Sequence, residues 1–183
     1  MTLLTPQEIE KIIKNKFPQA QVLIEDRGIA PGYPDLRRAS IRMYLFGSLV
    51  QFNYGENIVL LLDGHVVDAL KNIPLLTPKD VKDAVEFWLN DIQKYLSHHE
   101  LPEVKHLARK YLGNEDKVER QTRALYVFYD VFFIVITPFA AFLFLKSTRK
   151  LVYFKRYNND SELEAFFKLS VVYAEHIRQG KIT

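Results

Sequence analysis

The stretch ALYVFYDVFFIVITPFAAFLFL, residues 124–145, limits the folds open to this 183-residue chain more than any other segment. As a helix, its 22 residues would span about 33 Å, close to the ~30 Å of hydrocarbon in a bilayer. Basic residues stand on both sides of it, as they do at the ends of many membrane spans. The run must therefore either cross a membrane or lie sheltered in a protein core.

The composition of the run favours strands. Residues 125–136 are almost all β-branched or aromatic, which is typical of a strand buried on both faces. Thr137-Pro138 then interrupts the run, and AAFLFL and LVYFKRY flank the five residues KSTRK as the arms of a hairpin would. We expect buried strands here. The alternative is a membrane-anchored accessory protein with a single span at 124–145.

The first hundred residues predict a helix, a β-meander and a long helix. Thr5-Pro6-Gln7-Glu8 is a capping signature, and Thr77-Pro78-Lys79-Asp80 repeats it before an apolar helical stripe from Val81 to Leu96. Residues 38–70 alternate strand-forming segments with glycine turns, including Asp63-Gly64. RGIAPGYPDL, residues 27–36, has two glycines and two prolines, so we expect an irregular loop there.

Residues 101–183 predict a helix, apolar strands, a hairpin and a final helix. The first helix runs from Pro102 to Leu112 before Gly113, and NEDKVERQTR, residues 114–123, also has helical spacing of charges. The last helix covers about residues 161–179. The fold class we predict is α+β, mainly antiparallel sheet with long amphipathic helices, in two similar α-β-α halves (1–100 and 101–183) that pack as one unit. The halves share no residue-level repeat.

Composition excludes several kinds of site. The chain has no cysteine, so disulfides, thiolate zinc sites and cysteine nucleophiles are ruled out, and a reducing, cytoplasmic location is expected. The amino terminus has no pattern of a secretion signal. The net charge of +3 is uneven: residues 1–100 carry 11 basic and 13 acidic side chains, against 14 and 9 in residues 101–183. Any electrostatic attraction of an anion therefore belongs to the second half.

We expect no catalytic residues, cofactor or metal. The seven glycines are scattered singly, unlike a phosphate-binding loop. His98, His99 and His106 cluster near two glutamates, but without the spacing of a known metal motif, and a solvated corner between helices is the simpler interpretation. Folding could still assemble an enzyme site from acid and base residues such as Asp130 or His65.

Two segments carry candidate contacts for anions or small ligands. The segment 146–157 is rich in basic and aromatic side chains and could bind single-stranded nucleic acid through Lys146, Arg149, Lys150, Tyr153, Lys155 and Arg156. The loop APGYPDLRR, residues 30–38, could contact a small molecule or peptide through Tyr33, Arg37 and Arg38. Each segment also has a plain structural interpretation, as a solvated hairpin tip or a connecting loop.

The final helix has two apolar stripes. One holds Leu163, Phe166, Phe167, Ser170, Ala174 and Ile177, and the other holds Ala165, Leu169, Val172 and His176. A single sheet covers only one of them, so the second stripe predicts either a helix buried between two layers of its own chain or a contact with another protein or a second copy of this chain. We prefer the contact. The sequence therefore favours a non-catalytic binding or assembly protein of the adaptor type, acting through this helix.

Overall fold

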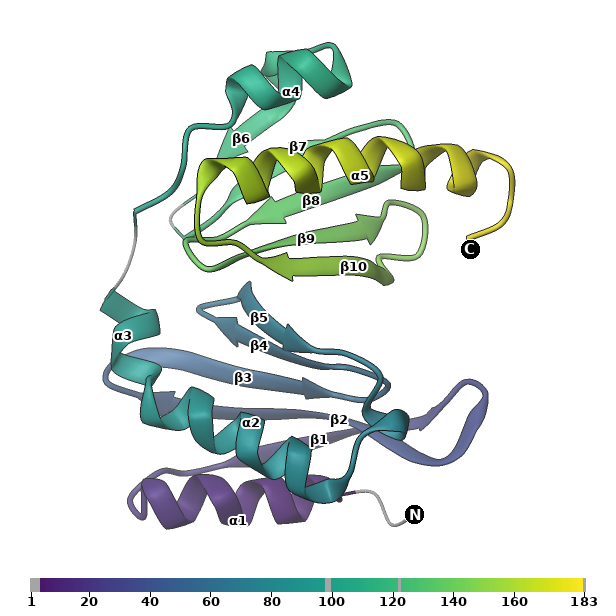
Figure 1. Ribbon diagram of the computed structural model, residues 1–183. Helices are drawn as coiled ribbons and strands as arrows, with labels where there is room; N and C mark the ends of the chain where they lie inside the picture. Colours follow the sequence, from purple (N-terminus) through teal and green to yellow (C-terminus); the bar gives the residue numbers. More distant parts are fainter. Residues whose placement is uncertain (1–3, 98–99, 122, 183) are drawn as a thin grey trace. The chain divides into compact units, whose positions relative to one another are not determined.

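The computed structural model describes residues 4–97, 100–121 and 123–182, and the chain divides into two compact units, Met1–His98 and His99–Thr183 (Figure 1). Each unit contains one antiparallel sheet of five strands together with helices. The predicted α+β class with antiparallel sheets is therefore confirmed.

The N-terminal unit is a meander in which each strand pairs with the next, in the order β1-β2-β3-β4-β5. Its elements are α1 (Pro6–Lys16), β1 (Leu23–Ala30), β2 (Tyr33–Leu45), β3 (Ser48–Tyr54), β4 (Ile58–Leu62), β5 (His65–Leu70), the 3-10 turn η1 (Ile73–Leu75), α2 (Pro78–Asn90) and α3 (Ile92–Ser97). The predicted stripe from Val81 to Leu96 is divided between α2 and α3, because the helix ends at Asp91.

Both capping signatures form as the sequence predicts. Thr5 accepts the backbone N–H of Glu8 at 3.2 Å, and the Glu8 carboxylate accepts the backbone N–H of Thr5 at 3.1 Å. Thr77 and Asp80 make the same reciprocal pair at the start of α2. Each box pairs amide groups that the first helical turn leaves without a partner, and so sets where the helix begins.

The irregular loop predicted for residues 27–36 is wrong, because these residues continue β1 and β2 as a hairpin. Pro31 and Gly32 form its two-residue turn, with Gly32 at φ 81°. Gly28, at φ 84°, lies at a β-bulge where the register shifts after Asp26. Its N–H donates to Asp26 Oδ1 at 2.7 Å. Glycine and proline here shape a hairpin, because each stands where the turn or bulge needs it.

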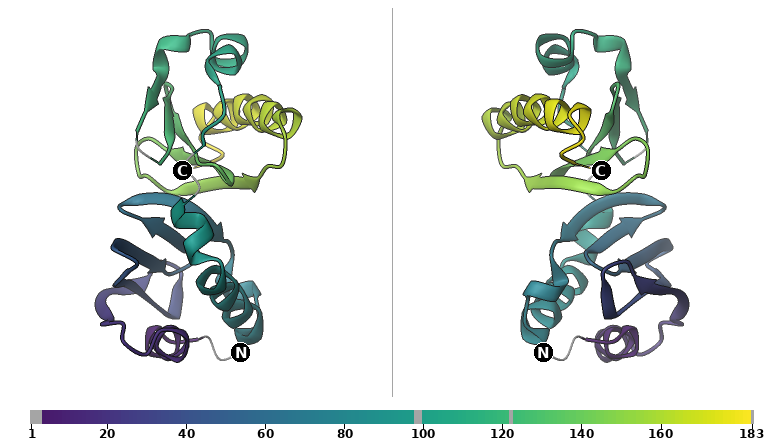
Figure 2. Two further views of the ribbon diagram at one scale, coloured as in Figure 1. Left: turned by 90° about the vertical axis from the view of Figure 1, so that its left-hand side faces the viewer. Right: turned by 90° about the vertical axis from the view of Figure 1, so that its right-hand side faces the viewer.

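The helices α1 and α2 lie on one side of the N-terminal sheet, as the end views in Figure 2 show. Phe52 of β3 stacks on Trp88 of α2, with ring centroids 5.9 Å apart. Asp68 of β5 is fully buried and accepts hydrogen bonds from Trp88 Nε1 at 2.9 Å and the Tyr95 hydroxyl at 3.3 Å. This carboxylate joins the last strand to both following helices.

The C-terminal unit has a similar order of elements, again as a meander with neighbours in chain order, but its 3-10 turn precedes the strands and one helix follows them. It contains α4 (Lys105–Leu112), the 3-10 turn η2 (Glu115–Lys117), β6 (Val118–Arg120), β7 (Leu125–Phe128), β8 (Phe132–Ile136), β9 (Ala140–Leu145), β10 (Leu151–Arg156) and α5 (Asp160–Arg178). Helix, five consecutive antiparallel strands and closing helix therefore occur twice, which agrees with two similar α-β-α halves.

The apolar run 124–145 forms the three strands β7, β8 and β9, so the prediction of strands is confirmed and the single helical span is wrong. Thr137 makes the turn after β8: its Oγ1 accepts the backbone N–H groups of Phe139 and Ala140, each at 3.1 Å. The helix considered for residues 114–123 is also wrong, since β6 pairs there with β7. Among the described residues, no helix has the length and apolar character needed to cross a membrane.

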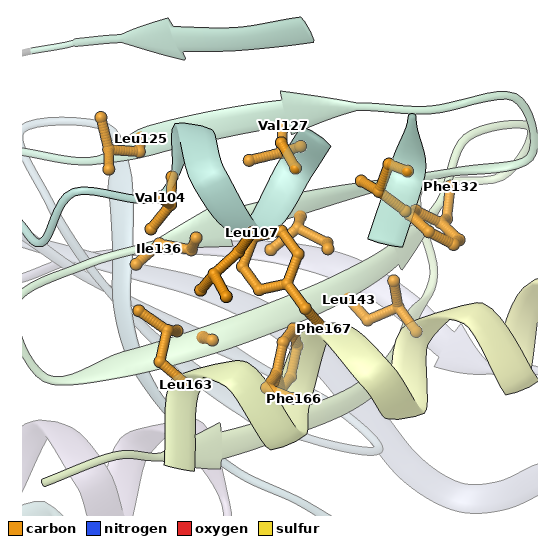
Figure 3. Packing of buried hydrophobic residues seen from close by; sticks show 14 of the residues in the cluster. Val104, Leu107, Leu125, Val127, Phe132, Ile136, Leu143, Leu163, Phe166 and Phe167 are labelled. Carbon is orange, nitrogen blue, oxygen red and sulfur yellow. The ribbon is translucent and has the colours of Figure 1, made fainter. Parts of the chain in front are cut away.

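The core of the C-terminal unit lies between its sheet and its two helices (Figure 3). Leu107 of α4 and Phe166 and Phe167 of α5 meet Phe132 and Leu143 of the sheet there. The two helices also contact each other. This packing decides which side of α5 faces inward, and so sets the surface described next.

Candidate interaction surfaces

Helix α5 presents one stripe to the core and a second stripe away from it. The inward side chains are buried: Leu163, Phe166, Phe167, Ser170 and Ala174. We call the second set the outer stripe, and its four members Ala165, Leu169, Val172 and His176 are all exposed. Leu169 is 36% exposed and Val172 is 49% exposed. The four residues that the sequence predicted as a contact surface are thus together on one accessible helix face.

Ser170 is the polar member of the inward stripe, and it can be buried because its hydroxyl finds a hydrogen-bond partner within the helix. Its hydroxyl donates to the carbonyl of Phe166 at 2.8 Å, one turn earlier, so this buried hydroxyl has a hydrogen-bond partner. His176, by contrast, is exposed on the outer stripe. The side of α5 that faces the core is thus the one with the two large phenylalanine side chains, and its one serine is hydrogen-bonded there.

Ion pairs hold α5 in this orientation. Glu164 accepts from Lys110 Nζ of α4 at 2.9 Å and from the Tyr111 hydroxyl at 3.1 Å. The hydrogen bond from Lys110, followed by that from Tyr111, lowers the pKa of the Glu164 carboxyl. At the other end of the helix, Arg178 lies 3.6 Å from Asp130 in the turn between β7 and β8. Each end of the helix therefore contacts another part of the C-terminal unit, and the outer stripe between these contacts stays exposed.

The basic residues of segment 146–157 are exposed, but their aromatic neighbours are engaged. The side chains of Lys146, Arg149, Lys150, Lys155 and Arg156 all lie at the surface of the hairpin formed by β9 and β10. Tyr153 packs on the helix side, with its ring centroid 5.6 Å from Phe166 and 5.5 Å from Tyr173. This hairpin therefore offers positive charge to the phosphates of a nucleic acid. Tyr153 already packs against Phe166 and Tyr173 of its own unit.

The three residues predicted as a loop contact lie in the hairpin of β1 and β2, and each has a partner. Arg37 Nε donates to Asp26 Oδ2 at 2.5 Å, and Arg38 donates to the carbonyl of Arg27 at 3.1 Å. The Tyr33 hydroxyl lies 3.5 Å from the Glu56 carboxylate. The Gly28 N–H and then Arg37 lower the pKa of Asp26. These contacts brace the hairpin internally.

An exposed apolar end of the N-terminal unit was missed by the sequence reasoning. Leu23 is 73% exposed, Tyr44 is 74% exposed, and Phe46 packs edge-on against Phe17 with centroids 5.9 Å apart. Phe46 has φ 52°, a conformation that costs a bulky side chain energy. The alternation of side chains along the strands could have predicted this surface, because it places Leu23 and Tyr44 on the face of the sheet without helices.

The side of the C-terminal sheet opposite its helices is aromatic. Cross-strand register aligns one row as Tyr126, Val135, Phe142 and Phe154, and a second as Phe128, Phe133, Phe144 and Leu151. Phe133 and Phe144 stack with centroids 5.1 Å apart, and Phe142 and Phe154 with 5.7 Å. Both faces of this sheet are apolar, as the composition of residues 125–136 predicted.

The described residues bring together no group of three or more histidine and carboxylate side chains that could hold a metal ion. His98 and His99 lie outside the described residues, while His106 is on α4. Asp130, considered as an acid or base, is exposed and pairs with Arg178. His65 opens β5.

No protein-family model, curated protein or solved structure matches this chain.

Proposed function

We propose that this protein is a non-catalytic binding or assembly component that docks onto another protein surface through the outer stripe of α5. The observation that carries the proposal is the exposure of Leu169 and Val172 on the side of α5 turned away from its core. We also propose a cytoplasmic location, on the basis of the cysteine-free sequence.

The spacing of the outer stripe suits recognition by a complementary protein surface. Residues 165, 169, 172 and 176 follow one another at intervals of four, three and four, so they line one helix face. A helix that inserts such anchors into an apolar surface is a recurring mode of protein recognition. Burying the exposed parts of Leu169 and Val172 would gain roughly 25 cal/mol for each Å² removed from water.

Site-specific photocross-linking in the cells that make the protein tests this proposal. A photoreactive residue at 169 or 172 should give adducts with a protein, whereas the same residue at the exposed Asn158 should give far fewer. Adding Leu169→Glu to the position-172 probe should abolish the adducts, because a charge on the stripe opposes apolar docking. Equal adduct yields at 169, 172 and 158 would defeat the proposal.

A second candidate function is sequence-independent binding of nucleic acid, favoured by the exposed basic side chains on the hairpin of β9 and β10. Because Tyr153 packs against Phe166, we expect phosphate contacts to dominate. Binding to a single-stranded oligonucleotide should then weaken steeply with salt, and Lys150→Glu should reduce both affinity and salt dependence. Unchanged retention of that variant would count against this candidate.

A further inference from the structure

We infer that the partner of the outer stripe is a second copy of this chain, docked with the two α5 helices antiparallel about a two-fold axis that passes between Leu169 and Val172. This inference rests on the proposed function and names the partner for the same surface. Its basis is that the outer stripe and its charged flank are complementary to themselves in this one orientation.

The apolar side chains match across the axis. In an antiparallel pair, residues equally distant from the axis meet, so Leu169 meets Val172 of the second copy and Ala165 meets His176 of the second copy. The smallest side chain of the stripe thus faces the largest one. The alternation of four and three residues is that of a knobs-into-holes seam, in which such pairs form successive layers.

The charges match in the same arrangement. Lys168 and Glu175 are both exposed and are seven residues apart, so they lie on the same flank of the outer stripe. The two-fold axis brings this flank of both helices together. Lys168 of one copy is then offset from Glu175 of the other by two residues, about 3 Å along the helix, which a long lysine side chain can span, and the symmetric contact repeats the pair. Glu175 already accepts from Arg178 at 2.9 Å, but with 58% of its side chain exposed it can accept a second donor.

A parallel arrangement lacks this match. Parallel helices in register would stack His176 on His176 and bring Lys168 next to Tyr173 of the second copy, with no charge pair on either flank. Tyr173 also packs against Tyr153 in its own unit, with centroids 5.5 Å apart. The antiparallel docking is therefore the one that uses both the apolar stripe and its charges.

The size of the contact predicts its strength. The stripe covers about three turns, a length of about 18 Å, and four side chains from each copy bury much less than the ~800 Å² per partner typical of stable complexes. We therefore expect a reversible monomer–dimer equilibrium with a Kd between about 1 µM and 1 mM. Self-association should be visible by sedimentation over about a hundredfold range of concentration around that value.

Charge exchange between Lys168 and Glu175 tests the inference. Lys168→Glu alone, or Glu175→Lys alone, turns both symmetric pairs repulsive and should weaken self-association about tenfold. The double variant restores both pairs and should return to the wild-type Kd. Most discriminating is a mixture of the two single variants, which should form a heterodimer although neither forms a homodimer well. All these residues are exposed, so unchanged thermal melting serves as the control for folding.

The outcomes separate this inference from the proposed function. A wild-type chain that stays monomeric over the whole range, or a mixture of single variants that fails to associate, overturns the second copy as partner. Cross-linked adducts at 169 and 172 whose mass differs from twice that of the chain would then leave the docking function in place with a different protein. Absence of adducts would defeat the docking function itself.

Discussion

The closing helices of the two units occupy the same place in the order of elements but have different outer faces. The outer face of α2 carries the i, i+4 ion pairs Lys79–Asp83 at 3.4 Å and Lys82–Glu86 at 3.8 Å. The outer face of α5 carries alanine, leucine, valine and histidine instead. Helix α2 also exposes an apolar side chain, Phe87 at 55%, beside these ion pairs, so the two helices differ in how many apolar side chains they expose. What sets α5 apart is that its exposed apolar side chains recur at helical spacing along one face.

The sheet faces without helices differ as well. In the N-terminal unit this face mixes polar and apolar groups: Gln51 donates to Asn53 at 2.7 Å and Arg42 pairs with Glu25, beside the exposed Leu23 and Tyr44. In the C-terminal unit the corresponding face consists of the two aromatic rows. Backbone pairing accepts either kind of side chain, so identical topology leaves the chemistry of this face open.

The largest loss of stability should follow from truncating a buried aromatic side chain, and it tests whether the cores of the two units contribute equally. Phe167→Ala in α5 and Trp88→Ala in α2 each remove a fully buried aromatic side chain. Each should lower the free energy of unfolding by about 3–5 kcal/mol, because a cavity replaces lost apolar contact. Urea titration followed by circular dichroism measures the change. A loss below about 1 kcal/mol in either case would show that its site collapses without a cavity.

A somewhat smaller effect should distinguish the N-terminal unit, whose core contains a buried carboxylate. Asp68→Ala leaves the Trp88 indole N–H and the Tyr95 hydroxyl without this acceptor, which should cost about 2–4 kcal/mol. Asp68→Asn is the matched control, since it keeps one acceptor oxygen and should cost less. If alanine and asparagine were equally destabilising, the negative charge rather than the acceptor would be what matters.

High pH should weaken both units through one tyrosine in each. The Tyr54 hydroxyl donates to the Leu4 carbonyl, and the Tyr157 hydroxyl donates to the Thr137 carbonyl at 2.5 Å. Burial, and then the charge of Glu8, raises the pKa of Tyr54 to about 12. Burial, and then Asp160, likewise raises the pKa of Tyr157 above its usual range.

A raised pKa means that folding favours the protonated hydroxyl. This stabilisation is complete below the ordinary pKa of 10.0 and is lost as the pH rises through the folded-state value. The free energy of unfolding should thus fall between about pH 10 and pH 12, and Tyr54→Phe should flatten part of that decline. A profile identical to wild type in Tyr54→Phe would assign the decline to other groups.

The smallest effect concerns the two outer faces directly. Leu169→Lys gives α5 a charged outer face like that of α2 and should change the free energy of unfolding by no more than about 0.5 kcal/mol. Glu86→Gln, which removes an exposed ion pair of α2, should have an effect of the same size. Thermal melting measures both. A large destabilisation by Leu169→Lys would mean that the outer stripe serves the fold of its own unit.

Local signals in the sequence predicted much of this architecture. Thr5 and Thr77 predicted helix starts, Asp63-Gly64 predicted a hairpin in which both residues have positive φ, and the β-branched and aromatic run 125–136 predicted strands. Two predictions failed. The two glycines and two prolines of residues 27–36 predict a loop, and the spacing of charges in residues 114–123 predicts a helix. In both places pairing with a neighbouring strand outweighed the local preference.

In the candidate interaction surface, too, the sequence determined one part and the tertiary structure the other. The sequence by itself determined that α5 carries two apolar stripes, since helical periodicity depends only on which residues recur every three or four positions. Only the tertiary structure decided which stripe faces outward, because that choice depends on burying Phe166 and Phe167 against β8 and β9 while Ser170 bonds to its own helix. Helical periodicity depends only on the local sequence, whereas burial depends on contacts between segments that are distant in the sequence.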